Sequence, residues 1–162
     1  ARVVIRRVVG KDGAVIRTDL EVRVTKGMRF LDLEHEIGHV NQFTDPQRFP
    51  DGPPPSDIVH ETASGGFHNA PNQSGVLTEW QNTITEYHNR MQEVAALADR
   101  GASPELIQEH LGGVAEWQQN YFQKGLKKGR SPSQRAWAEE HFPDIRQLEA
   151  RVQEIRAQFS GR

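Results

Sequence analysis

Five apolar residues between positions 29 and 43 recur three or four positions apart. They are Phe30, Leu33, Ile37, Val40 and Phe43. Such spacing predicts an amphipathic helix whose apolar stripe packs in a core. Asp45 and Pro46 follow directly, and we expect them to end the helix.

Two segments rich in β-branched residues, 3–9 and 14–24, precede this helix. Between them lies Gly10-Lys11-Asp12-Gly13, and an Asp-Gly pair between two such runs predicts a β-hairpin. Leucine and valine alternate with polar residues over positions 20–25, so we expect the second strand to bury one face only.

The rest of the chain combines one irregular segment with several helices. Residues 46–75 hold six of the nine prolines, and we expect a surface loop that could cover a cleft. Helices are predicted over 76–99, from Ser103-Pro104 onwards, around 133–141 and from Pro143 or Asp144 to the C-terminal end.

These elements predict an α+β fold. An N-terminal β-hairpin or small sheet is expected to pack on the helix of residues 29–43, and a mainly helical C-terminal part follows. We expect one domain over 1–162, with a catalytic core in 1–100 and a helical extension in 101–162.

The composition excludes several kinds of site and partner. The chain has no cysteine, so any metal must be held by His, Asp or Glu. The 20 Lys and Arg and the 22 Asp and Glu give a net charge of −2, so no overall positive field favours nucleic acid. No apolar run approaches the ~20 residues of a membrane-spanning helix, so no membrane span is expected.

The predicted helix contains His35-Glu36-Ile37-Gly38-His39, an H-E-x-x-H sequence. Residues four apart lie on one helix face, so both imidazoles can reach one metal ion. Imidazole suits Zn²⁺, and a catalytic zinc keeps one coordination position open for water. Glu36 is then expected to act as general base, taking a proton from that water and returning it to the leaving amine.

The sequence resembles the zincin metallopeptidases in three places: the β-unit 3–24, the segment LEHEIGHVNQF (33–43) and the later segment TEWQNTITEYHNRMQEV (78–94). More narrowly, it is similar to zincin-like C-terminal toxin domains of bacterial polymorphic toxins, including Rhs-type proteins. The resemblance implies zinc-dependent proteolysis of a target-cell protein and a cognate immunity protein that blocks it. It also implies a domain that is secreted or delivered into a target cell as part of a larger polypeptide.

The third metal ligand is open among four acidic residues. Glu86 is the first choice, because zincins of the glutamate type place a Glu ligand on a helix after the motif; alternatively, it pairs with Arg90 on the helix surface. Glu79 lies two turns earlier on the same flank. Glu61 lies in the segment predicted to be a loop, a less rigid setting for a ligand.

Asp45 is the fourth candidate. The spacing of His35, His39 and Asp45 resembles the metzincin pattern, in which a glycine turn returns a third ligand to the metal. This chain has Gln42 where that glycine should be, and a non-glycine residue resists the required backbone. Gln42 shares the helix face of both histidines. The alternative to the metzincin pattern is that Gln42 hydrogen-bonds to one of the histidine ligands of the metal.

Tyr87 and His60 are further candidates, as donors to the oxyanion of the substrate. For Tyr87 we favour packing in the apolar stripe of its helix, and we expect the neighbouring His88 to face solvent.

Two other functions remain open. The chain could be a non-catalytic helical interaction domain with a vestigial or structural metal site, or a zinc amidase acting on cell-wall peptides. Replacement of Glu36 separates catalytic from structural zinc, because only a catalytic site needs the general base.

Overall fold

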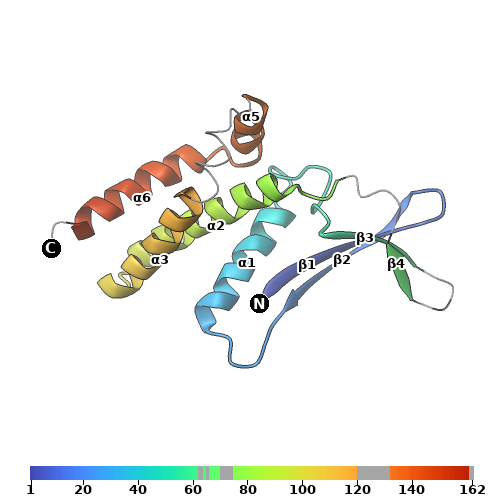
Figure 1. Cartoon of the computed structure of the whole chain (residues 1–162), viewed down its shortest axis with the longest axis horizontal. Coiled ribbons are helices and arrows are strands. Elements are labelled where there is room, and N and C mark those ends of the chain that lie inside the picture. Colours follow the sequence, from blue (N-terminus) through green and yellow to red (C-terminus); the bar gives the residue numbers. More distant parts are fainter. Residues whose placement is uncertain (62–63, 65, 70–74, 120–131, 161–162) are drawn as a thin grey trace. The chain divides into compact units, whose positions relative to one another are not determined.

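The computed structural model of the chain describes residues 1–61, 64, 66–69, 75–119 and 132–160 (Figure 1). The chain divides into two compact units, Ala1–Thr78 and Glu79–Arg162. The first holds a small sheet and one helix, and the second is helical, which confirms the α+β class. The division falls before the long helix that begins at Glu79, whereas the sequence grouped that helix with the N-terminal core. Among the described residues, no helix is both long and apolar enough to cross a membrane.

Four strands form the sheet of the first unit, in the order β2-β1-β3-β4. Strands β1 (Arg2–Val9) and β2 (Val15–Arg23) form the predicted antiparallel hairpin. At its turn Gly13 has a φ of +80°, and the Asp12 carboxylate accepts a hydrogen bond from the Ala14 amide at 3.0 Å. The Asp-Gly pair therefore supplies both the left-handed residue and the side-chain acceptor that this turn uses.

Strands β3 (Asp57–Glu61) and β4 (Phe67–Asn69) lie within the segment that the sequence predicted to be an irregular loop. That prediction is wrong for these residues. Strand β3 pairs in parallel with β1, and β4 pairs antiparallel with β3. Five and three residues are too few to show alternation, and the parallel pairing joins segments about fifty positions apart.

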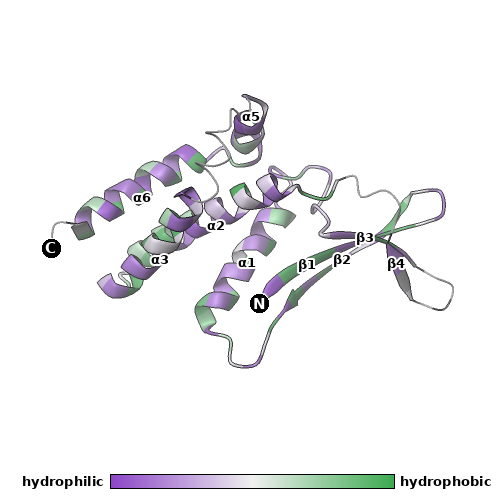
Figure 2. Ribbon diagram, in the orientation of Figure 1, coloured by the Kyte–Doolittle hydropathy of each residue, from purple (hydrophilic) through white to green (hydrophobic). Residues whose placement is uncertain are grey.

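Strand β2 lies at one edge of the sheet and is exposed along most of its length. The prediction that it buries one face is wrong: Leu20 and Val24 belong to the exposed large hydrophobic residues. Figure 2 shows the hydrophobic character of this hairpin. The buried residues of the sheet lie instead on β1 and β3, and they include Ile5, Val8, Ile58 and Val59.

Helix α1 (Phe30–Thr44) has almost the predicted bounds, and Asp45 caps its C-terminal end. At its start the Asp32 carboxylate accepts the Arg29 amide at 3.1 Å and pairs with the Arg29 guanidinium, which lowers the pKa of Asp32 below its ordinary value. The predicted apolar stripe is not the buried face, because Phe30 is 71% and Ile37 46% exposed. The buried residues of α1 are His35, Glu36, His39 and Gln42.

In its described residues, the second unit has the helices α2 (Glu79–Asp99), α3 (Pro104–Trp117), α5 (Pro132–His141) and α6 (Ile145–Ser160). All four helices were predicted. Helix α2 packs against both α3 and α6. Its predicted stripe is buried, with Ile84, Tyr87, Met91 and Val94 in the core.

Gly101 ends α2 in the left-handed conformation, with a φ of +67°. Its amide donates to the carbonyl of Ala98 and the Ala102 amide donates to that of Leu97, which is the Schellman arrangement. Ser103 then caps α3, because its hydroxyl accepts the Leu106 amide. These local signals explain why the sequence placed the α2–α3 connection correctly.

We predict opposite effects for the same substitution at two glycines. Gly101→Ala should lower the free energy of unfolding by about 1 kcal/mol, because a side chain disfavours positive φ. Gly112→Ala should raise it by about 0.8–1.0 kcal/mol, because Gly112 lies within α3 and an added methyl group meets open space. Urea unfolding followed by circular dichroism measures both, and shifts of the same sign would contradict the assignment.

Candidate metal centre

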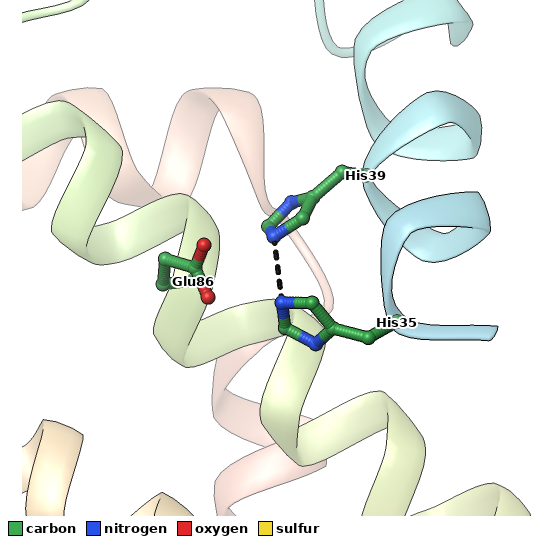
Figure 3. Close-up of side chains that lie close together, drawn as sticks. All are labelled: His35, His39 and Glu86. Atoms are coloured by element: carbon green, nitrogen blue, oxygen red, sulfur yellow. Dashed lines mark hydrogen bonds between the residues drawn. The ribbon is translucent and has the colours of Figure 1, made fainter. Parts of the chain in front are cut away.

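His35 and His39 lie one turn apart on the buried face of α1, and they are 9% and 5% exposed. Their rings meet edge to face, with centroids 4.7 Å apart. The two Nε2 atoms face each other across 3.1 Å, which Figure 3 shows as a dashed line. Both imidazoles therefore direct the same nitrogen toward one point.

Gln42 determines which nitrogen of His39 carries a proton. Its Oε1 lies 2.9 Å from His39 Nδ1, and a carbonyl oxygen can only accept, so Nδ1–H is the donor. The neutral His39 ring then has its lone pair on Nε2, the atom that faces His35. Phe43 stacks on the other side of the His39 ring at 5.7 Å and restricts its rotation.

The spacing of the two nitrogens suits a metal ion. Two nitrogens about 2.0–2.1 Å from a tetrahedral zinc lie about 3.3 Å from each other. The observed 3.1 Å is close to that value. The same spacing also allows the His35 Nε2–H group to donate to His39 Nε2, so a shared proton and a metal ion can occupy the same position.

Glu36 lies between the two histidines in sequence and is 8% exposed. Within the part of the chain that the structure describes, no hydrogen bond or ion pair engages its carboxylate. Its oxygens are not among the fully buried side-chain atoms that lack a partner, so the carboxylate still reaches solvent. It can therefore hydrogen-bond to a water molecule beside His35 and His39.

Glu86, the first choice for the third ligand, belongs to a set of described residues that could hold a metal ion. One ligand atom from each of His35, His39 and Glu86 lies within 4.8 Å of the others, and Figure 3 draws these three side chains. Glu86 lies on α2 and is half-buried. Arg90, the alternative partner of Glu86, pairs with Glu93 at 3.7 Å.

Of the other acidic candidates, Glu79 and Asp45 are not part of this set of residues. Glu79 is exposed in the first turn of α2. Glu61 ends β3, and its side chain is outside the described part of the structure. Asp45 has local partners for both oxygens, the Gln47 amide at 2.9 Å and the Arg48 guanidinium at 3.2 Å.

His60 and Tyr87, the two candidate donors to the substrate oxyanion, each form a hydrogen bond within the protein. His60 lies on β3, where its ring donates to the carbonyl of Val9. Tyr87 is buried in the core of the second unit, as we favoured, and its hydroxyl donates to Glu149 at 3.2 Å. Burial, with a smaller contribution from Glu149, raises the pKa of Tyr87, so the residue stays a phenol at neutral pH.

His88 is 0% exposed, so the prediction that it faces solvent is wrong. Its Nε2 lies 2.9 Å from a carboxylate oxygen of Asp144, and its ring contacts Phe142. Local spacing could not predict this pairing, because Asp144 lies 56 positions away.

Comparison of the chain with protein-family models, curated proteins and solved structures finds no match in any of the three. The assignment of function therefore depends on the residues themselves.

We predict that Gln42→Leu weakens zinc binding by about 10–100-fold, since residues that orient a histidine ligand typically contribute that much to affinity. Asn41→Leu is the matched control, because Asn41 is the neighbouring residue and is exposed on the same helix. Competition with a chromogenic chelator measures both affinities. Equal affinities in the two variants would show that the His39–Gln42 hydrogen bond does not support the site.

Proposed function

We propose that this protein is a zinc-dependent peptidase. The proposal is carried by one observation, the facing Nε2 atoms of His35 and His39 with a carboxylate oxygen of Glu86 within 4.8 Å. His35, His39 and Glu86 are the ligands in this proposal, Glu36 is the general base, and a protein or peptide is the substrate.

The donor set supports zinc as the metal. Two imidazole nitrogens and one carboxylate oxygen are a common ligand set of catalytic zinc, whereas Mg²⁺ and Ca²⁺ prefer oxygen ligands alone. Structural zinc sites are usually closed by four protein ligands. The group found among the described residues has three, which leaves a position for water or substrate and favours catalysis over a purely structural role.

The site residues on α1 have distinct roles in this proposal. When bound, zinc supplies Lewis acidity, which activates water and polarises a carbonyl group. Glu36 takes the proton of the attacking water and delivers it to the leaving amine. Gln42 holds His39 as the Nδ1–H tautomer, so that Nε2 is the ligand atom.

The toxin setting is a further part of the proposal. It is supported by the resemblance of residues 1–100 to zincin-like toxin domains, whose sharpest element is the sequence HEIGH. In that setting the domain acts on a protein of a target cell, and a cognate immunity protein protects the producer. Co-expression with a neighbouring gene product tests it: relief of growth arrest supports an immunity protein.

We predict that Glu36→Gln keeps zinc and loses hydrolysis. The substitution preserves side-chain shape and removes the group that accepts the proton, so kcat should fall by about 10²–10⁴-fold. Metal analysis of the purified variant, with mass-spectrometric detection of cleavage in a peptide mixture, measures both properties. Unchanged hydrolysis would exclude Glu36 as the base, and zinc without hydrolysis in the unmodified protein would favour the structural-metal alternative.

A second prediction concerns the third ligand. Glu86→Gln should reduce bound zinc and lower zinc affinity by at least about tenfold, because a neutral amide is a poor ligand for zinc. Glu79→Gln is the matched control, since it makes the same change on the same helix at an exposed position. If the two variants bind zinc equally well, Glu86 is not a ligand.

A further inference from the structure

A second pair of histidines lies on the sheet of the first unit. His60 on β3 is directly opposite His68 on β4 in the antiparallel register. Directly opposed residues of two antiparallel strands point to the same face, with Cβ atoms about 4.5–5.5 Å apart. The ring centroids are 5.2 Å apart and the ring planes are inclined by 32°. Neither histidine belongs to the peptidase site proposed above.

The tautomer of His60 is fixed by the backbone. Its Nδ1 lies 3.2 Å from the carbonyl oxygen of Val9 on β1, and because a carbonyl only accepts, the proton is on Nδ1. The lone pair of the neutral ring is therefore on Nε2. A backbone carbonyl on one ring nitrogen is also the usual way in which a metal-binding histidine is oriented.

His68 completes the pair from an exposed position. In the described part of the chain, no hydrogen bond or ion pair engages its ring. Rotation of this exposed side chain therefore costs little, and it can bring a ring nitrogen toward His60. The centroid separation of 5.2 Å is only slightly larger than the 4.7 Å between His35 and His39, whose nitrogens already face each other.

We propose that His60 and His68 form a second binding site for a divalent transition-metal ion such as Zn²⁺. Imidazole nitrogen favours such ions over Mg²⁺ and Ca²⁺. Water fills the remaining positions, because no third acidic or histidine ligand groups with this pair among the described residues. The site is therefore weaker than the three-ligand group on α1 and α2. Its ion links the three-residue strand β4 to β3.

Zinc titration of the full chain, after removal of bound metal with a chelator, tests this site. The unmodified protein should bind two equivalents in calorimetry, the second more weakly. His68→Asn should abolish the weaker equivalent and retain the tighter one. His110→Asn is the matched control, because it removes an imidazole on α3, outside both groups. It should retain both equivalents.

Long-range ¹H–¹⁵N spectra of the imidazole rings add an independent measurement. Before zinc is added, His60 should show the Nδ1–H tautomer. The Nε2 signal of His60 and a ring nitrogen signal of His68 should then shift together as the second equivalent binds. The proposal is overturned if His68→Asn loses no zinc equivalent relative to the unmodified protein, or if these signals stay unchanged during the titration.

The experiment also separates this site from the peptidase site. His35→Asn should abolish the tighter equivalent and leave the weaker one. A protein whose only zinc is lost in His68→Asn and kept in His35→Asn would support the second site and contradict the proposed function. The reverse pattern would contradict the second site alone.

Discussion

The approach of two imidazole nitrogens to 3.1 Å on one helical turn governs the chemistry open to this protein. It requires α1 to turn its polar face inward, which places His35, His39 and Gln42 among the buried residues. Such a face is costly to bury unless its polar atoms have partners. The His39–Gln42 hydrogen bond and the His35–His39 contact supply partners within the helix itself.

In the first unit, helix α1 comes between strands β2 and β3 in the order of the chain, and both strands belong to the same sheet. Because β1 and β3 are parallel, the chain must return to the starting end of the sheet before β3 begins. Strand β2 runs antiparallel to β1 and makes that return, and helix α1 follows it before β3 begins. At the entry to β3, Ser56 joins it to β1, since its amide donates to the Ile5 carbonyl at 2.8 Å and its hydroxyl accepts the Ile5 amide. The motif helix is thus part of the crossover.

The second unit is organised around a helix with an unusual number of buried polar residues. Thr83, Thr85, His88 and Asn89 of α2 are all buried. The two threonine hydroxyls donate to carbonyls one turn earlier, and His88 pairs with Asp144 at the start of α6. Tyr87 and Glu149 form a second link between α2 and α6. Directional contacts of this kind favour one packing of two helices over others that apolar contacts alone would allow.

Local geometry made several features predictable from the sequence alone. The Asp12-Gly13 turn, the Gly101 and Ser103 caps and the facing of His35 and His39 all depend on residues at most five positions apart, so fixed backbone geometry determines them. The tertiary structure decided two others: the buried face of α1 and the pairing of β3 with β1. Helical spacing shows which residues share a face, but not which face turns inward. The strand pairing depends on contacts between distant segments, which no local spacing encodes.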